Sequence, residues 1–212
     1  MKKSTHERER LAREQDMLDA AVKLFCENGF EKTSMEDLAK ESEYTKKTIY
    51  RYFTCKEDLF FAVILQGNRT LSDMIAKSYN SDNNGLENIR CAYSAFYNFY
   101  CENNQLLQLM AMVGMVKSRS ADKEVPFREK CDEQTTTIFK NIADLFFLAK
   151  ADGSIRPDLD VNVLAYSSVF MTTGFFNQFS LSGDSFTRFI KMDRELFVSF
   201  CIDRMIDSLL LA

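Results

Sequence analysis

The sequence predicts an all-α protein, because helix-breaking residues are scarce and apolar residues recur at helical spacing. The 212 residues include only seven glycines and two prolines, too few for a turn-rich β architecture. Apolar residues make up 46% of the chain, which is a globular composition sufficient for a sizeable core. We expect about nine helices, divided into a three-helix head and a larger helical body.

The head is predicted within residues 1–56. Residues 1–9 are polar without periodicity and are predicted to form a flexible tail. Residues 10–28 are predicted as a helix, because Leu18, Ala21, Val22 and Phe25 have helical spacing and Asn28-Gly29 can cap its C-terminus. Two short helices are expected before the domain ends at residue 56.

The body is predicted over residues 57–212. Its clearest breaks are the turn 81–85 and the loop 152–160, which gather Gly, Pro, Asn and Asp. The apolar spacing between the breaks predicts helices over 56–79, 86–102, 105–117, 126–149, 161–181 and 186–211. The first of these helices would connect the body to the head.

A pattern typical of a helix-turn-helix begins at Ser34. This residue can cap a short helix, with Asp37 three positions on as in a capping box. Thr45 can cap a second helix, in which Ile49 and Phe53 are four apart and share the inward face. The other positions of the second helix carry cations, hydroxyls and phenols, which suit a groove lined by phosphates. The pattern predicts a DNA-binding protein.

Motifs on both sides of this pattern carry a family resemblance. They are Phe25, Asn28-Gly29-Phe30, Thr33 to Ala39, Thr48 to Phe53 and Lys56 to Leu59. In order and spacing they resemble the N-terminal domain of the tetracycline-repressor (TetR) family over residues 12–65, and residues 153–160 resemble the loop before that family's penultimate helix. The resemblance implies a homodimeric transcriptional regulator with a ligand-binding and dimerisation body. It further implies a repressor of a palindromic double-stranded operator, released by a small apolar or amphipathic ligand.

The resemblance also implies roles for individual residues of the head. Thr33, Tyr50, Tyr52 and Lys56 match positions that mainly hold phosphates, which position the protein without reading sequence. Residues at the turn and at the start of the second helix can reach base edges, and Lys47 is the best candidate for a guanine contact. The full predicted set is Thr33, Ser34, Tyr44, Thr45, Lys46, Lys47, Thr48, Tyr50, Arg51, Tyr52 and Lys56.

Two residues depart from the family pattern. Glu43 replaces the usual turn glycine, and Lys47 replaces a glycine early in the recognition helix. If the turn keeps a left-handed conformation, Glu43 costs roughly 1 kcal/mol. Glu43 also motivates a rival interpretation, a helical ligand-binding or interaction module that has lost specific DNA binding.

The body is rich in aromatic residues and methionine, and the resemblance favours a ligand pocket among them. The alternative is that these side chains simply fill the core. The predicted pocket residues are Tyr93, Phe96, Phe99, Met110, Met112, Met115, Phe139, Asn141, Phe146, Phe170 and Met171.

The last two predicted helices carry apolar residues on more than one face, although a monomer has one interior. Together with the resemblance this predicts a four-helix dimer interface, the alternative being a fully buried central helix. The predicted interface residues are Val163, Ser167, Gly174, Phe175, Phe200 and Ile206.

Catalytic, metal and cofactor sites are not expected. The chain has one histidine, His6, and its six scattered cysteines form no C-x-x-C pair. There is no apolar leader or membrane span, so we expect free thiols and a cytoplasmic location. Residues 1–56 hold 12 Lys/Arg against 11 Asp/Glu, a net charge of +1, whereas residues 57–212 hold 15 against 20, a net charge of −5. The cation bias lies where DNA contacts are predicted.

Overall fold

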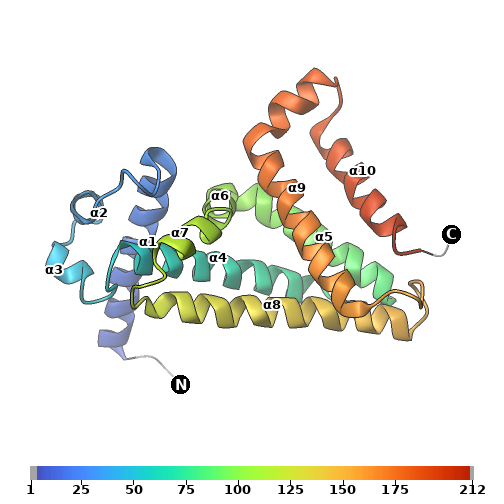
Figure 1. Cartoon of the computed structure of the whole chain (residues 1–212), viewed down its shortest axis with the longest axis horizontal. Helices are drawn as coiled ribbons and strands as arrows, with labels where there is room; N and C mark the ends of the chain where they lie inside the picture. Colours follow the sequence, from blue (N-terminus) through green and yellow to red (C-terminus); the bar gives the residue numbers. More distant parts are fainter. Residues whose placement is uncertain (1–3, 211–212) are drawn as a thin grey trace. The chain divides into compact units, whose positions relative to one another are not determined.

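The computed structural model describes residues 4–210, which form ten α-helices and no strand (Figure 1). The predicted all-α class is therefore confirmed. The helices are α1 (Thr5–Asn28), α2 (Met35–Glu41), α3 (Lys46–Ile49), α4 (Lys56–Ser78), α5 (Gly85–Glu102), α6 (Asn104–Met110), α7 (Val113–Arg119), α8 (Pro126–Ala151), α9 (Val161–Phe189) and α10 (Arg194–Asp207). They pack into two compact units. The first unit runs to Gly67 and also includes Gln105–Glu133, and the second comprises Asn68–Asn104 and the chain from Gln134 on.

The core of the first unit is built around three phenylalanines. The rings of Phe25, Phe30 and Phe60 lie 5.2–6.1 Å apart, which is the range of favourable edge and tilted ring contacts. Ile49 and Phe53 are fully buried in the same core, as the sequence predicts. These two anchors fix the orientation of α3.

The first unit is larger than the predicted head of residues 1–56. All residues from Leu59 to Ile64 on α4 are buried, and Leu109, Val116 and Val125 join the same core. Residues 59–65 of α4 are apolar on every side, so they need cover that α1–α3 do not provide. The segment Gln105–Glu133 supplies that cover, and the structure divides the chain differently from a boundary at residue 56.

The second unit packs α5 against α9 and α10. The ring of Phe176 lies 5.4 Å from those of both Phe96 and Tyr100, and Tyr100 also contacts Phe179. Gly85 lies so close to α8 that a Cβ atom would come within 2.1 Å of the Cα of Ala149. Only glycine fits the start of α5 for this reason.

Three predicted boundaries are corrected by local hydrogen bonding. Helix α1 begins at Thr5, because the Ser4 hydroxyl accepts a hydrogen bond from the Glu7 amide at 3.2 Å; residues 1–3 of the predicted tail lie outside the described residues. The predicted helix 105–117 is divided into α6 and α7.

Helix α9 continues through the gap between the predicted helices 161–181 and 186–211, where the Thr187 hydroxyl donates to the carbonyl of Gly183 at 2.9 Å. The chain turns instead at Lys191, whose φ is 53°. The end of the predicted last helix, Leu211, lies outside the described residues.

Candidate nucleic-acid interface

Helices α2 and α3 are both capped by the residues that the sequence predicts. The Ser34 hydroxyl accepts from the Asp37 amide at 3.2 Å, and the Asp37 carboxylate accepts from the Ser34 amide at 2.9 Å. The Ser34 hydroxyl also donates to the Asp37 carboxylate at 2.6 Å, and this hydrogen bond, together with that from the Ser34 amide, lowers the pKa of Asp37. Thr45 caps α3 by accepting from the Thr48 amide at 3.2 Å. The caps therefore fix where α2 and α3 begin, and Thr45, Lys46 and Lys47 at the start of α3 are exposed.

The turn between the two helices has the left-handed conformation that the resemblance implies. Glu43 has a φ of 58°, a region in which an L side chain is strained. We expect Glu43→Gly to raise the free energy of unfolding by about 0.5–1 kcal/mol, because glycine relieves this strain. Urea denaturation measures the change.

The control for this prediction is Lys40→Gly, an exposed position inside α2. Glycine there should lower the free energy of unfolding by about 1 kcal/mol. If both glycine variants destabilise the protein equally, the turn is not strained.

The exposed side of α3 carries the groups that can reach a DNA groove. Lys47, Tyr50 and Arg51 are exposed, and within residues 4–210 their side chains make no hydrogen bond or ion pair. Lys46 is also exposed but pairs with Glu36, and the hydrogen bond to Glu36 raises the pKa of Lys46. Lys47 on α3, and Arg51 in the turn that follows the C-cap Tyr50, are thus the cations ready to meet phosphates or bases.

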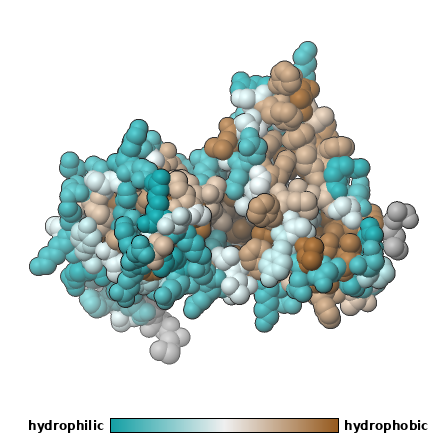
Figure 2. All heavy atoms as spheres, in the orientation of Figure 1, coloured by the Kyte–Doolittle hydropathy of each residue, from teal (hydrophilic) through white to brown (hydrophobic). Residues whose placement is uncertain are grey.

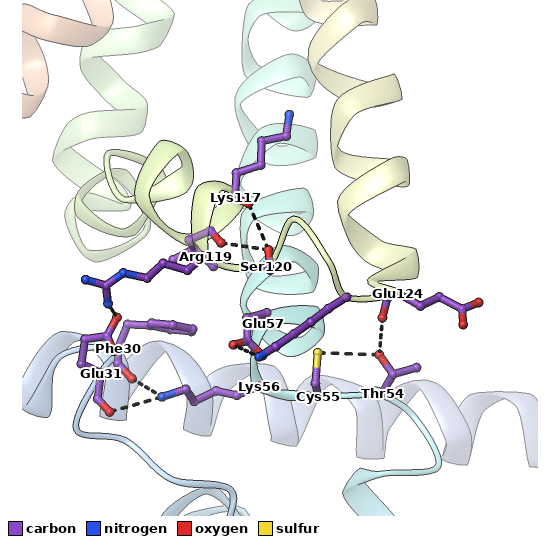
Figure 3. A network of polar contacts seen from close by, with 12 residues as sticks. Phe30, Glu31, Thr54, Cys55, Lys56, Glu57, Lys117, Arg119, Ser120 and Glu124 are labelled. Carbon is purple, nitrogen blue, oxygen red and sulfur yellow. Dashed lines mark hydrogen bonds and ion pairs between the residues drawn. The ribbon is translucent and has the colours of Figure 1, made fainter.

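Two predicted phosphate contacts have structural roles instead. Thr33 is 1% exposed, and its hydroxyl hydrogen-bonds the carbonyls of Leu24 and Gly29 at 3.2 and 2.9 Å. The Lys56 ammonium donates to three backbone carbonyls, of Phe30, Glu31 and Thr33, at 2.7, 3.3 and 2.9 Å, and lies 4.4 Å from the centre of the Phe30 ring (Figure 3). Burial lowers the pKa of Lys56. The Thr33 and Lys56 side chains therefore tie the loop before α2 to α1 and α4.

Other predicted contacts are engaged to different degrees. The Tyr44 phenol donates to the Asp16 carboxylate on α1 at 2.8 Å, and this hydrogen bond raises the pKa of Tyr44, whereas the nearby charge of Arg13 acts in the opposite direction. Tyr52 is half-buried against the core. The Asp16–Tyr44 contact places α1 beside the start of α3, and no sequence pattern indicated this proximity.

The chain from Arg119 at the end of α7 to Glu124 is bonded to the loop before α2 and to the start of α4 (Figure 3). The Thr54 hydroxyl donates to the carbonyl of Glu124 at 3.3 Å, and Lys123 lies 2.6 Å from Glu57. Arg119 pairs with Glu31 in the loop before α2. These polar contacts, together with the apolar packing on α4, hold residues 105–133 in the first unit.

The predicted pocket residues do not gather around one cavity. Met110, Met112 and Met115 belong to the first unit, whereas the remaining members belong to the second. Tyr93, Phe96, Phe99 and Phe146 are buried core residues, and the Tyr93 hydroxyl is 2.8 Å from that of Ser168. Phe139 packs 5.1 Å from the ring of Tyr166, while Phe170 and Met171 are exposed. Tyr93, Phe96, Phe99 and Phe146 therefore fill the core, which was the alternative to a ligand pocket.

A different apolar groove lies between α4 and α8 in the second unit, and of the predicted set it includes Asn141. Its volume is about 330 Å³, and an adjoining hollow of about 320 Å³ shares Tyr79, Leu145 and Leu148 with it. The groove is lined by Ser72, Ile75, Ala76, Tyr79, Ile138, Asn141, Ile142, Asp144, Leu145 and Leu148. The spacing of Ile138, Ile142 and Leu145 was the available signal, but sequence alone could not tell a groove wall from core.

An apolar surface covers α9 and α10 (Figure 2). Val163, Phe170 and Leu181 are 64%, 83% and 74% exposed, and their separations of seven and eleven residues put them on one face of α9. Phe200 is exposed on α10, and Ser167 and Gly174 lie on the same face of α9 as Phe170. Two predicted interface residues are corrected, because Ile206 is 2% exposed and Phe175 packs on Phe176 and Phe179 in its own unit.

Within the described residues, no helix has both the length and the apolarity to cross a bilayer. The same residues contain no group of three or more His, Cys, Asp or Glu placed to hold a metal ion.

Comparison with known proteins gives consistent results. Residues 17–63 match the family model described as bacterial regulatory proteins, tetR family. The chain is 23% identical over 156 residues to the fatty acid metabolism regulator protein of Bacillus subtilis, covering 74% of this chain and 77% of that protein. It is 28% identical to an HTH-type transcriptional regulator of Staphylococcus aureus, covering 70% and 78%.

Solved structures share the fold over nearly the whole chain. The regulator FadR of Bacillus subtilis in complex with stearoyl-CoA has a TM-score of 0.71 at 17% identity, covering 91% of this chain and 97% of that chain. A tetR-family regulatory protein from Rhodococcus has a TM-score of 0.73 at 14% identity, covering 94% and 98%.

Proposed function

Because the chain belongs to the TetR family of DNA-binding transcriptional regulators, we propose that it is a homodimeric repressor released from its operator by an apolar ligand. The observation that carries the proposal is that Lys47 on the capped helix α3 and Arg51 just after it are exposed and form no ion pair with residues 4–210. Exposed cations beside a helix N-terminus favour a phosphate-lined groove. In the proposed complex, α3 enters the major groove and Lys47 reaches base edges.

The proposed partner of the α9–α10 surface is a second copy of this chain. Val163, Phe170 and Leu181 form one stripe along α9, and monomeric proteins rarely expose contiguous apolar surface of this kind. Ser167 and Gly174 are small and lie between the large side chains, which permits close helix approach. A two-fold axis through this stripe would pair two copies by identical surfaces and present two copies of α3 to a palindrome.

The proposed ligand is an elongated apolar molecule in the groove between α4 and α8. Isoleucine and leucine side chains make up much of the groove wall, and from Ile138 to Ala151 on α8 the two adjoining hollows extend over about 20 Å at 1.5 Å per residue. That shape suits a long aliphatic chain better than a compact ring system. The stearoyl-CoA in the Bacillus subtilis FadR complex is a ligand of this kind and makes stearoyl-CoA a suitable probe.

Ligand release follows from differential affinity. Helix α4 contributes its first turns to the head's unit and its last turns to the groove, so an occupant of the groove contacts an element that the head also holds. A ligand that prefers the conformation with lower operator affinity will weaken DNA binding by that preference.

We expect Lys47→Ala to relax the sequence preference at one base pair, at a cost of about 1–3 kcal/mol for the preferred base. The reason is that an alanine cannot donate to the guanine acceptors. A binding selection from a random duplex pool measures the preference position by position. Lys40→Ala, which removes an exposed lysine from α2, is the control and should leave the preference unchanged. Equal weakening on all duplexes would reassign Lys47 to a phosphate.

We expect Ala76→Trp to fill the groove and abolish the effect of stearoyl-CoA on operator affinity, while leaving operator binding without ligand intact. Ala76 lines the groove and is exposed, so the added ring enters the cavity without disturbing the core. Lys77→Trp, one position on, is the matched control and should still respond. Fluorescence titration of a labelled operator with and without stearoyl-CoA distinguishes them. A response retained by Ala76→Trp would exclude this groove as the ligand site.

A further inference from the structure

The first three turns of α1 bury no side chain and contact the rest of the head through the Asp16–Tyr44 hydrogen bond. From Ser4 to Asp16 no residue is buried, and the first buried side chain of the helix is Met17. These turns precede the residues that match the family model, which begin at residue 17. A helix with no buried face has little tertiary support in the free protein, so an external partner is a physical reason for it.

One side of this extension lies beside the start of α3. The Tyr44 phenol, directly before the cap Thr45, is held by Asp16 at 2.8 Å. Arg13 is three residues before Asp16 and so lies on the neighbouring position of the same helix face. The Arg13 guanidinium is therefore carried toward the same edge of the head as the N-terminus of α3.

The Arg13 side chain is free to bind an anion. It is exposed, and it forms no ion pair in residues 4–210, although Glu9 and Asp16 flank it at helical spacing. A guanidinium offers five donors in a planar fork, which matches phosphate oxygens.

We propose that residues 4–16 of α1 are a second DNA-contacting element, in which Arg13 binds the phosphate next to those reached from the N-terminus of α3. This inference rests on the proposed DNA binding and adds an element of the contact surface to it. Arg13 fixes position on the duplex and reads no base, because a phosphate contact carries no sequence information.

The helix itself provides a matched control. Arg8 is also exposed, but at about 100° per residue it lies roughly 140° around the helix from Arg13. Arg8→Ala removes the same charge from the same extension on a different side. Neither substitution removes a buried contact, so both variants should melt at the wild-type temperature.

The experiment titrates wild type, Arg13→Ala, Arg8→Ala and Arg13→Lys against a duplex that the wild type selects from a random pool, at several salt concentrations. We expect Arg13→Ala to lower affinity about tenfold at low salt and to reduce the slope of log affinity against log salt by about 0.9, the value for one phosphate. Arg8→Ala should change affinity less than about twofold, and Arg13→Lys should keep most of the salt slope.

Equal losses for Arg13→Ala and Arg8→Ala would overturn the proposal, because a general charge effect would then suffice. An unchanged salt slope for Arg13→Ala would also overturn it. Both results presuppose salt-dependent binding by the wild type; if the wild type selects no duplex, the proposed DNA binding itself fails, and the two failures are distinguishable.

Discussion

Replacing Phe170 or Leu181 with glutamate is expected to convert the proposed dimer into monomers and to lower operator affinity roughly 100-fold or more. Both residues belong to the exposed apolar stripe of α9. A stable interface buries about 1,200–2,000 Å² in total, and an unpaired carboxylate inside it costs several kcal/mol. Once the copies separate, each head binds its half-site without the effective concentration that its partner provides. Sedimentation velocity and operator titration measure the two effects.

Met115→Glu is the control for the dimer prediction, since Met115 is an exposed apolar residue of the first unit, away from α9 and α10 in the sequence. It should leave both sedimentation and operator affinity near the wild-type values. Phe175 is a poor choice for this test, because it packs inside its own unit and a charge there would disturb folding. A wild-type monomer that binds a palindrome tightly would refute the dimer.

Asp58→Ala is expected to lower the free energy of unfolding by about 2–4 kcal/mol, corresponding to roughly 5–15 °C in melting temperature. Asp58 is 1% exposed, and its carboxylate accepts from the amides of Thr54 at 2.9 Å and Phe127 at 2.8 Å. The alanine variant leaves both amide groups without their acceptor in a region that water reaches poorly. Thermal melting followed by circular dichroism provides the measurement.

The matched control is Glu31→Ala, which removes a carboxylate of the same network at an exposed position. Its ion pair with Arg119 is solvated, so the loss should stay below about 1 kcal/mol. If the Asp58→Ala and Glu31→Ala variants have the same melting temperature, the junction between the starts of α4 and α8 contributes little to the stability of the first unit.

The sequence was most informative where local signals and burial agree. Ser34 and Thr45 cap α2 and α3 as predicted, and Ile49 and Phe53 are buried as predicted. A side-chain cap and an i, i+4 apolar pair are determined within one or two turns of chain, so no distant partner is needed to recognise them.

Roles that depend on distant partners could not be predicted. Thr33 and Lys56 match the family's phosphate-holding positions, but their polar groups are taken up by carbonyls of residues 24–33. The inclusion of residues 105–133 in the first unit likewise depends on packing against α4, which periodicity does not specify. The many aromatic residues between 93 and 179 indicate apolar surface, but the sequence does not show whether each side chain faces the core, the groove or a partner.

The stoichiometry of the complex on selected DNA tests most directly whether two copies of α3 read a palindrome. Duplexes selected by the wild type from a random pool should contain two inverted half-sites centred about 10–10.5 base pairs apart, or a multiple of that distance. Sedimentation of the complex should show a whole number of protein pairs on each duplex. A selected site with a single half-site bound by one chain, or no selected site, would contradict the account.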